Sequence, residues 1–312
     1  MLCVVAPGQG AQSPGMLKPW LDLPGATEAL TSWSAASKID LIQHGTKSDA
    51  ETIRDTAIAQ ALLVANALLT IRNLYPEKRD LLRQVHLVAG HSVGELAAAA
   101  ISGVVSDIVA MELVGVRGRA MAVAAAVTPT SMTAVLGGEQ NKVIEHLTKL
   151  DLVAANVNGA GQIIAAGSLE SLARLADNPP DKTKLRPLSV AGAFHTKYMQ
   201  SAVEALRGAA AYLAAKDPEI TLLSNRDGAI VDTGTDALVR IVNQVSNPVR
   251  WDLCQKSMQR LGVTGILELA PGGTLTNIAK REFEDISTFA IKTPEDIAAA
   301  KEFILTHQRR AA

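Results

Sequence analysis

Residues 85–100 read VHLVAGHSVGELAAAA, and this stretch decides the fold. Residues 85–89 are apolar except for His86 and predict a short strand. Residues 95–100 are rich in alanine and predict a helix. Between them, GHSVG at residues 90–94 matches Gly-x-Ser-x-Gly, in which a serine occupies a sharp turn from strand to helix. We therefore expect the Ser92 hydroxyl to be exposed at a helix N-terminus, where backbone N–H groups stabilise negative charge.

The pentapeptide alone is weak support for a nucleophile. Glycine and serine are common, so a chain of this length contains such a match by chance about one time in ten. An ordinary glycine turn is therefore the alternative to a nucleophilic serine. The strand before Gly90 and the helix from Glu95 favour the nucleophile, because they supply the context in which the motif is functional.

Apolar patterning on either side of this stretch predicts an α/β fold in which a hydrolase-like larger domain has a mainly parallel sheet. A strand at residues 2–6 leads into a glycine loop at 8–12, and apolar residues at helical spacing mark one or two helices within 50–74. The remaining elements expected of this domain are a helix at 105–126, a helix at 197–216, a strand at 221–224, a helix at 236–245 and a strand at 265–269.

Residues 130–191 have a different order of predicted strands and helices, which indicates an inserted subdomain. The expected elements are strands at 132–136, 152–157, 162–166 and 185–190, with helices at 141–150 and 169–176. This β-α-β-β-α-β order is that of a ferredoxin-like unit, here with its own four-stranded sheet. The larger domain is then discontinuous and comprises residues 1–129 and 192–312.

The composition excludes several classes of function. The 312 residues are 48% hydrophobic but only 3% aromatic, which suits parallel strands covered by alanine-rich helices. Thirty basic and thirty-one acidic side chains leave no excess charge for a phosphate backbone, so nucleic acid is not an expected partner. The two cysteines, Cys3 and Cys254, form no metal or redox motif. No signal peptide or membrane span is expected, and we predict a cytoplasmic protein.

A serine nucleophile needs a base, and the chain has six histidines. His91 adjoins Ser92, but successive side chains diverge at such a turn, so we expect His91 to line the pocket instead. His195 is the stronger candidate, because a predicted strand ending at Val190 leads into a glycine loop that presents it to a neighbouring site. A loop histidine with an ordinary structural role is the alternative.

Six motifs spread over nearly the whole chain resemble, in order and spacing, those of the malonyl-CoA:acyl carrier protein transacylases. They are PGQGAQ at residues 7–12, GHSVGE at 90–95, Arg117-Gly118, Asn158 with Gln162, GAFH at 192–195 and NPVRW at 247–251. Several motifs in register are far more specific than any one of them. The resemblance implies an acyltransferase that moves a malonyl group from coenzyme A to an acyl carrier protein.

The resemblance assigns Ser92 as the nucleophile that attacks the thioester and His195 as the base that takes its proton. The family has no acidic third member. A backbone carbonyl near Gln244 and Asn247 is therefore expected to orient the imidazole, which is weaker than a carboxylate but still fixes the tautomer.

The resemblance also assigns the backbone N–H groups of Val93 and Gln9 as an oxyanion hole. Arg117 lies in an apolar helical context, where an unpaired guanidinium is costly and needs an anionic partner. In the family the corresponding arginine binds the free carboxylate of the malonyl group. A structural ion pair with Glu95 or Glu112 is the alternative.

Other residues are assigned to substrate binding by the same resemblance. They are His91, Phe194, Gln60, Asn158 and Gln162. Phe194 is expected to crowd a branch on the middle carbon of the substrate, and a methyl group shifts such discrimination by ~1–3 kcal/mol. The resemblance therefore favours malonyl over methylmalonyl groups.

The reaction implied by the resemblance uses no permanently bound cofactor and no metal. Malonyl-CoA is the donor, and the carrier protein supplies its own phosphopantetheine thiol. An acidic helix of the carrier is expected to meet basic residues beside the site. The candidates are Lys182, Lys184, Arg186, Lys197, Lys280 and Arg281. The protein is expected to be a monomer. Its carrier protein belongs to fatty acid biosynthesis or to polyketide synthesis, since both use the same malonyl loading step.

Two other functions remain open on the sequence alone. A serine hydrolase or thioesterase has the same serine turn and uses a carboxylate between serine and histidine in the chain. Carboxylates in that interval are Asp151, Glu170, Asp177 and Asp181. A docking module that binds carrier protein without chemistry is the second alternative. The buried cation expected at Arg117 favours malonyl transfer over hydrolysis, and the intact set of reacting residues favours catalysis over docking.

Overall fold

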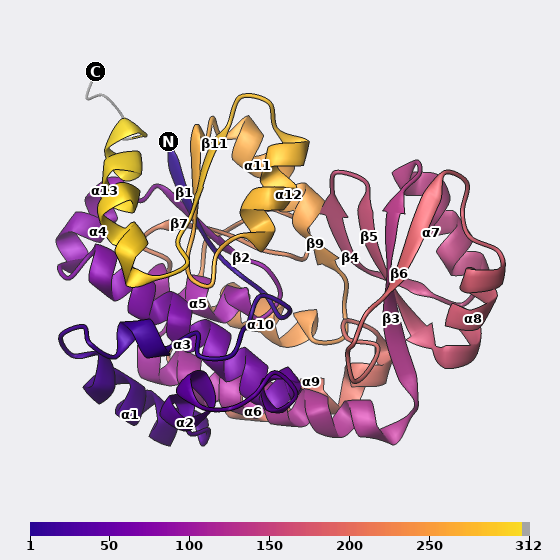
Figure 1. Ribbon diagram of the computed structural model, residues 1–312, viewed down its shortest axis with the longest axis horizontal. Coiled ribbons are helices and arrows are strands. Elements are labelled where there is room, and N and C mark those ends of the chain that lie inside the picture. The colour runs from indigo at the N-terminus through magenta and orange to yellow at the C-terminus, as the bar shows by residue number, and fades with distance from the viewer. Residues whose placement is uncertain (308–312) are drawn as a thin grey trace.

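The computed structural model describes residues 1–307, which form a mixed α/β fold with two sheets (Figure 1). The larger sheet has six strands. In spatial order they are β11 (Ser287–Ala290), β10 (Gly265–Glu268), β1 (Leu2–Ala6), β2 (Leu87–Gly90), β7 (Thr221–Leu223) and β8 (Ile230–Val231). All neighbours are parallel except the edge pair of β7 and β8, so the mainly parallel sheet predicted from the sequence is confirmed.

Helices cover both faces of the larger sheet (Figure 1). The helices of this part of the chain are α1 (Ala26–Ser37), α2 (Leu41–Thr46), α3 (Thr56–Leu74), α4 (Lys78–Gln84), α5 (Gly94–Ile101), α6 (Asp107–Val127), α9 (Gln200–Ala210), α10 (Gly234–Gln244), α11 (Trp251–Arg260), α12 (Thr274–Glu282) and α13 (Ile297–Thr306), of which α1 and α2 pack on α3 and α6. Val4 and Ala6 of β1 belong to the core that includes α3 and α5, whereas Cys3 and Val5 belong to the core that includes α11 and α12. Alternate residues of one strand thus serve opposite faces, which is why the strand is apolar at every position.

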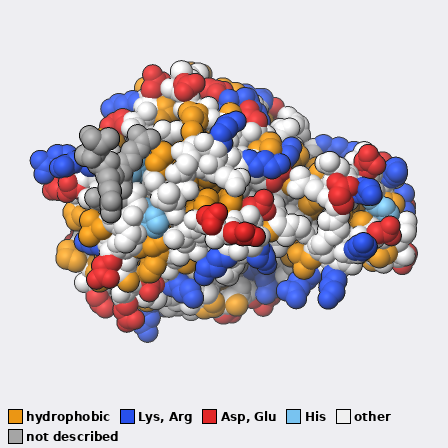
Figure 2. All heavy atoms as spheres, turned by 90° about the horizontal axis from the view of Figure 1, so that it is seen from above, with side chains coloured by type: hydrophobic (Ala, Val, Ile, Leu, Met, Phe, Trp, Pro, Cys, Tyr) orange, Lys and Arg blue, Asp and Glu red, His pale blue; other side chains and the backbone are white. Residues whose placement is uncertain are grey.

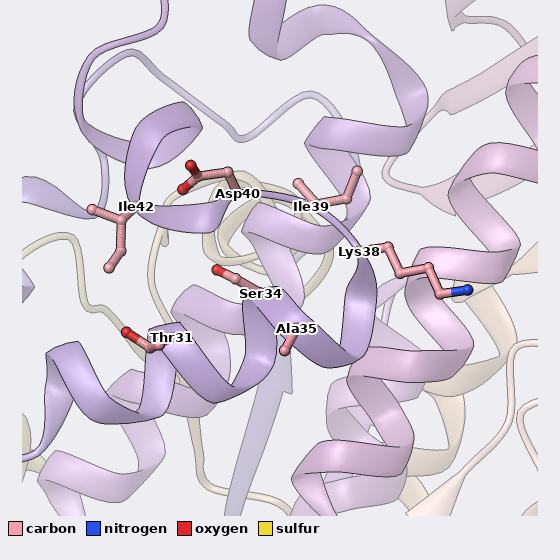
Figure 3. Close-up of a pocket in the computed structure, with 7 residues that line it drawn as sticks. All are labelled: Thr31, Ser34, Ala35, Lys38, Ile39, Asp40 and Ile42. Carbon is pink, nitrogen blue, oxygen red and sulfur yellow. The ribbon is translucent and has the colours of Figure 1, made fainter.

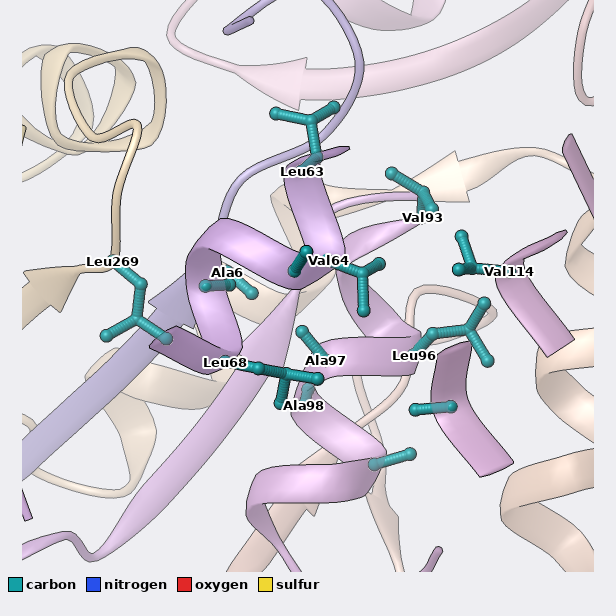
Figure 4. Packing of buried hydrophobic residues seen from close by; sticks show 14 of the residues in the cluster. Ala6, Leu63, Val64, Leu68, Val93, Leu96, Ala97, Ala98, Val114 and Leu269 are labelled. Carbon is teal, nitrogen blue, oxygen red and sulfur yellow. The ribbon is translucent and has the colours of Figure 1, made fainter. Parts of the chain in front are cut away.

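Helix α3 lies at the centre of the larger core. Its Val64 and Leu68 belong to the same buried cluster as Ala6 of β1 and Ala97 of α5 (Figure 4). Among the described residues it is the one helix with the length and composition to cross a membrane, and 78% of its apolar window is buried inside the protein. Such burial is what a core helix shows, so its apolar composition is explained by packing.

The second sheet has five strands. In spatial order they are β6 (Thr183–Pro187), β3 (Thr130–Gly137), β5 (Gln162–Ser168), β4 (Val153–Gly159) and β9 (Val249–Arg250). One face is covered by α7 (Gln140–Lys149) and α8 (Leu169–Asp177), and Val135, Leu147 and Ile163 belong to the separate core formed there. Because side chains alternate along a strand, the intervening residues point to the opposite face, toward the larger domain.

The βαββαβ order predicted for residues 130–191 is present, but the sheet is not self-contained. Its fifth strand, β9, comes from a later part of the chain and pairs in parallel with β4, with Val249 opposite Asn156. The prediction of four strands was therefore wrong by one. The strand predicted at 185–190 is also displaced, because β6 spans Thr183–Pro187. Beyond it the N–H of Leu188 still donates to the carbonyl oxygen of Met132 at 3.0 Å, and the chain then turns, with the N–H of Val190 donating to the carbonyl oxygen of Leu188.

The helix predicted at residues 197–216 is shorter than expected. It begins as a 3-10 turn at Lys197–Met199, continues as α9 and ends at Ala210. Beyond that point the backbone N–H of Lys216 donates to the carbonyl oxygen of Val104 at 2.9 Å, so a tertiary hydrogen bond replaces a helical one. The elements that no sequence pattern predicted are α1, α2, α4, α11, α12, α13, β8, β9 and β11.

Helix α3 begins after Asp55, whose carboxylate accepts hydrogen bonds from the backbone N–H of Ala57 at 2.8 Å and of Ile58 at 3.3 Å. We expect Asp55→Ala to lower the free energy of unfolding by about 0.5–2 kcal/mol, because both N–H groups lose this partner. Urea unfolding followed by circular dichroism measures the change. Glu145→Ala, at an exposed position inside α7, removes the same charge without a cap. Equal losses in the two variants would contradict the capping role.

Candidate active site

Ser92 occupies the turn between β2 and α5 with a backbone φ of 53°, in the left-handed region that non-glycine residues rarely adopt. The turn is tight because neither flanking glycine has room for a side chain. A Cβ on Gly90 would overlap the backbone of Gly94, and a Cβ on Gly94 would overlap the carbonyl oxygen of Ala6 in β1. The strand, turn and helix predicted for this motif are therefore present, with β2 extending to Gly90.

A side-chain amide that the sequence analysis missed braces this turn. Asn225 follows β7, the parallel neighbour of β2. Its Oδ1 accepts a hydrogen bond from the backbone N–H of Ser92 at 2.8 Å, and its Nδ2 donates to the carbonyl oxygen of Gly90 at 2.8 Å. Its position just after a predicted strand could have suggested a site residue, because the carboxyl ends of parallel strands meet at one edge of the sheet.

Ser92 and His195 form a hydrogen-bonded pair. The distance from Ser92 Oγ to His195 Nε2 is 2.8 Å, and His195 Nδ1 lies 2.8 Å from the main-chain carbonyl oxygen of Gln244. A carbonyl oxygen only accepts hydrogen bonds, so Nδ1 carries the proton and Nε2 can accept one from the serine hydroxyl. The geometry therefore brings together a serine, a base and an orienting carbonyl.

Burial determines the protonation state of His195, which is 3% exposed. Burial, followed by the positive charge of Arg117, lowers the pKa of His195 to about 3, and the hydrogen bond to the carbonyl of Gln244 acts in the opposite direction. The imidazole is therefore neutral at physiological pH, which is the state that a general base needs.

Two hydroxyl groups fix the loop that carries His195, whose own backbone φ is 60°. The Thr130 hydroxyl of β3 accepts a hydrogen bond from the N–H of Ala193 at 2.9 Å. The Thr196 hydroxyl donates to the carbonyl oxygen of Ala193 at 2.6 Å. The loop is thus anchored to the first strand of the second sheet, and the imidazole has a defined position opposite Ser92.

Arg117 of α6 lies directly behind Ser92 and is 1% exposed. Its guanidinium donates to three neutral oxygens, which are Gln60 Oε1, Gln244 Oε1 at 2.9 Å and Ser92 Oγ at 3.3 Å. Gln60 and Gln244, two predicted site residues, thus orient a cation toward the nucleophile by hydrogen bonds from opposite sides.

No ion pair within residues 1–307 involves Arg117, so the structural pair with Glu95 or Glu112 considered above is absent. Burial lowers the pKa of Arg117 to about 10, while the negative charge of Glu95 acts in the opposite direction. The guanidinium therefore stays charged at neutral pH. A buried cation whose contacts are all neutral is suited to an anionic group on a substrate.

The backbone N–H groups of Val93 and Gln9 have no hydrogen-bond partner within the described part of the chain. Val93 directly precedes α5, so its N–H is one of the donors that a helix N-terminus leaves unpaired. The Gln9 loop runs against the serine turn, since a Cβ on Gly8 would lie 2.7 Å from the carbonyl oxygen of His91. These two donors remain the predicted oxyanion hole.

A cleft of about 360 Å³ opens in front of Ser92. Predicted site residues on its wall are Gln9, Gln60, His91, Ser92, Asn158, Gln162, Phe194 and His195. Arg117, Gln244 and Val93 lie behind this wall. Apolar wall residues that the sequence analysis missed are Met121, Met132, Ile164, Leu188, Leu275 and Ile278. These come from five separate segments of the chain, so no local pattern could have grouped them.

His91 makes no hydrogen bond to Ser92 within the described residues and lies on the cleft wall. Its Nε2 lies 2.9 Å from Asn158 Oδ1, and Asn158 Nδ2 donates to Gln162 Oε1 at 3.0 Å. Burial lowers the pKa of His91, so the ring is neutral and Nε2–H donates to Asn158. The three predicted binding residues thus form one polar chain along the cleft wall.

A second hollow of about 390 Å³ lies beside α1 and α2 (Figure 3). Its wall carries Thr31, Ser34 and Lys38 but no histidine or cysteine, so it offers no activated nucleophile. Within residues 1–307, no group of three histidine, cysteine, aspartate or glutamate side chains is arranged to hold a metal ion. Burial raises the pKa of both free thiols, Cys3 and Cys254, which makes them poor nucleophiles.

The lowered pKa of His195 predicts that the rate constant for acylation of Ser92 does not fall as the pH is lowered from neutral to mildly acidic values. A base whose pKa lies below its ordinary value stays unprotonated until the pH falls to that lower value. The rate constant for acylation by p-nitrophenyl acetate, an ester with no carboxylate for Arg117, should therefore stay constant from about pH 8 to about pH 5. Stopped-flow release of p-nitrophenol, with Ser92→Ala as the blank, measures it. A decline centred near the ordinary histidine pKa of about 6.5 that persists in Glu95→Gln, which removes the other buried group whose pKa lies in this range, would show that His195 is not shielded.

Residues 4–301 match the model of the family described as acyl transferase domain. A malonyl CoA-acyl carrier protein transacylase of Mycobacterium tuberculosis is 48% identical over 95% of this chain and 98% of its own length. One of Haemophilus influenzae is 30% identical over 97% of this chain and 98% of its own.

Solved structures agree with these relatives. The crystal structure of MCAT from Mycobacterium tuberculosis matches with a TM-score of 0.92 at 48% identity, over 96% of this chain and 99% of that one. A malonyl-transacylase in complex with its type II PKS acyl-carrier protein matches with a TM-score of 0.88 at 25% identity, over 96% of this chain and 99% of that one. The chain therefore belongs to the acyl transferase family and, within it, to the malonyl CoA-acyl carrier protein transacylases.

Proposed function

We propose that this chain transfers a malonyl group from coenzyme A to the phosphopantetheine thiol of an acyl carrier protein through an ester on Ser92. The observation that carries the proposal is the buried, charged guanidinium of Arg117, which has one nitrogen 3.3 Å from the Ser92 oxygen. A malonyl group carries a carboxylate one carbon away from its thioester carbonyl. That carboxylate can pair with Arg117 while the carbonyl carbon faces Ser92. The names of the relatives describe the same reaction.

In the first half of the reaction, His195 Nε2 takes the proton of the Ser92 hydroxyl while Oγ bonds to the thioester carbon. The N–H groups of Val93 and Gln9 stabilise the negative charge that forms on the carbonyl oxygen. The carbon–sulfur bond then breaks, and His195 returns the proton to the departing thiolate. The products are a malonyl ester of Ser92 and free coenzyme A.

The second half reverses these roles. The phosphopantetheine thiol of the carrier gives its proton to His195, and its sulfur attacks the ester carbon. The carbon–oxygen bond breaks and Ser92 recovers the proton. One imidazole thus performs all the proton transfers, and neither half calls for a bound cofactor or a metal. Substrate binding falls to the polar residues His91, Asn158, Gln162 and Gln60, and to Phe194, which limits branching next to the carbonyl.

The domain organisation forms part of the proposal. The strand order β6-β3-β5-β4, with both helices on one face, supports a ferredoxin-like subdomain at residues 130–191. The larger, hydrolase-like domain then comprises residues 1–129 and 192–312. A cytoplasmic location is proposed as well, in keeping with the two free cysteines.

Basic side chains flank the cleft on two sides. Lys280 and Arg281 are exposed on α12, whose Leu275 and Ile278 line the cleft. Exposed basic residues on the other side, on or beside β6, are Lys182, Lys184 and Arg186. Lys and Arg side chains are interspersed with Asp and Glu on both lobes of the face seen in Figure 2. We propose that an acidic carrier protein docks across these two sides.

The malonyl contact predicts a selective defect in Arg117→Ala. We expect the rate constant for acylation of Ser92 by malonyl-CoA to fall about 10- to 150-fold, the value of a charge-assisted hydrogen bond of about 1.5–3 kcal/mol. Acylation by acetyl-CoA should fall much less. Rapid-quench intact-protein mass spectrometry measures both adducts. Arg119→Ala is the matched control, because Arg119 also lies in α6 but donates to the carbonyl oxygen of Ser37.

The same experiment distinguishes the other functions. Discharge of the malonyl adduct by holo acyl carrier protein supports transfer, whereas fast release of malonate without carrier would indicate a hydrolase. Absence of any adduct would indicate a docking module. An equal loss with both acyl groups in Arg117→Ala would refute the carboxylate contact.

Charge reversal tests the docking sides. We expect the double variant Lys280→Glu with Arg281→Glu to lower kcat/KM for the carrier protein about tenfold at low salt, and less at high salt, because the attraction is screened. Lys184→Glu with Arg186→Glu reports on the opposite side. Acylation by malonyl-CoA, measured separately, corrects for any change at the active site. Unchanged kcat/KM for the carrier in both double variants would exclude these surfaces.

A further inference from the structure

The one acidic side chain of the serine motif GHSVGE, that of Glu95, lies behind the site and has no role in the reaction steps above. Glu95, in the first turn of α5, is 4% exposed. Its Oε1 accepts a short hydrogen bond from the backbone N–H of Asn225, and its Oε2 accepts one from Gln244 Nε2 at 2.6 Å. Its carboxylate oxygens are therefore both engaged, and neither is hydrogen-bonded to Ser92 or His195.

The Gln244 side chain connects this carboxylate to the cation. Its Oε1 accepts from Arg117 Nη2 at 2.9 Å. Its Nε2 donates to Glu95 and lies 3.1 Å from both the carbonyl oxygen of Ser92 and Asn225 Oδ1. Three acceptors surround the nitrogen and a donor faces the oxygen, so only one orientation of the amide satisfies the network.

We propose that Glu95 is a positioning residue that acts through Gln244: it fixes the amide so that the oxygen holds Arg117 beside Ser92, while leaving the guanidinium charge free for the carboxylate of the acyl group. The inference rests on the proposed malonyl transfer. It adds a specificity role to the glutamate of the serine motif and to the side chain of Gln244, whose main-chain carbonyl already orients His195.

The neutral amide between anion and cation explains how the site can keep an unpaired charge in its interior. A carboxylate in direct contact with Arg117 would neutralise it and would have to be displaced by each incoming malonyl group. Across the amide, the charge of Glu95 still raises the pKa of Arg117 against the effect of burial. Arg117 thus remains charged and oriented, and its closest anionic partner is left to the substrate.

The Glu95→Gln variant removes the acceptor without changing the size of the side chain. If the introduced amide keeps its oxygen toward the N–H of Asn225, its own NH₂ faces that of Gln244, and two donors oppose each other. Turning the Gln244 amide over would place its NH₂ against Arg117 and its oxygen against the Ser92 carbonyl. Either arrangement disturbs the support of Arg117.

The experiment compares single-turnover acylation of Ser92 by malonyl-CoA and by acetyl-CoA, followed by intact-protein mass. It is run at about pH 8, above the value of about 7 to which burial raises the pKa of Glu95, so that the carboxylate is ionised. We expect the ratio of malonyl to acetyl rate constants to fall at least about tenfold in Glu95→Gln. The matched control is Glu112→Gln, which removes an exposed charge from α6 and should leave the ratio unchanged.

A second variant keeps the test decisive if Glu95→Gln does not fold, as judged by thermal unfolding. Gln244→Met retains Glu95 and the main-chain carbonyl but removes the amide oxygen that holds Arg117, so the same ratio should fall. Using a ratio cancels any shift of His195, because both acyl groups need the same base. An unchanged ratio in folded Gln244→Met would overturn the idea that the Gln244 amide holds Arg117 beside Ser92.

The outcomes also separate this inference from the proposed function. Arg117→Ala, measured alongside, tests malonyl recognition by itself, and an unchanged ratio there would overturn both proposals. Suppose that Arg117→Ala lowers the ratio but Glu95→Gln lowers both rate constants in proportion. Glu95 then only supports the serine turn through Asn225, and the proposal that it positions Arg117 through Gln244 is wrong. A selective loss of malonyl acylation in both variants supports the proposal that Glu95 positions Arg117.

Discussion

Helix α5 begins in contact with the backbone of β1, because Gly94 leaves no space in front of the carbonyl oxygen of Ala6. This contact forces Ser92 into the left-handed region and turns its hydroxyl away from the sheet, toward His195. It also places the unpaired N–H of Val93 at the start of the helix. The imidazole, the guanidinium and the Gln9 loop all have to converge on the one oxygen whose position this contact sets, so the packing of a helix on a strand determines the chemistry.

The electrostatics of the site follow a consistent rule: each functional group that is or becomes positively charged is held by neutral partners. A main-chain carbonyl orients His195, and two glutamine side chains orient Arg117. A carboxylate in either place would lower the local potential and compete with a negatively charged acyl group. The buried Glu95 is kept one amide away from the guanidinium. The interior thus retains a net attraction for a negatively charged substrate.

Local sequence was sufficient where local forces decide the structure. The apolar run, the two glycines and the alanine-rich helix predicted the serine turn, and the motifs shared with a known family predicted Arg117, Gln60 and His195 as site residues. Asn225 and the part played by Glu95 depend on β7 lying beside β2, a pairing of distant segments that no periodicity encodes. Strand β9 is two residues long, too short to show alternation. Helix α9 ends early because hydrogen bonds to a distant loop replace those of the helix.

The short segment from Gln244 to Arg250 first supplies the carbonyl that holds His195 and then the strand that joins the second sheet. A hinge movement that parted the two lobes would therefore pull the imidazole of the proposed base away from Ser92. The pairing of Ser92 with His195 is thus coupled to the contact between the two lobes, so that the register of a two-residue strand on the second sheet sets the position of an imidazole at the edge of the first.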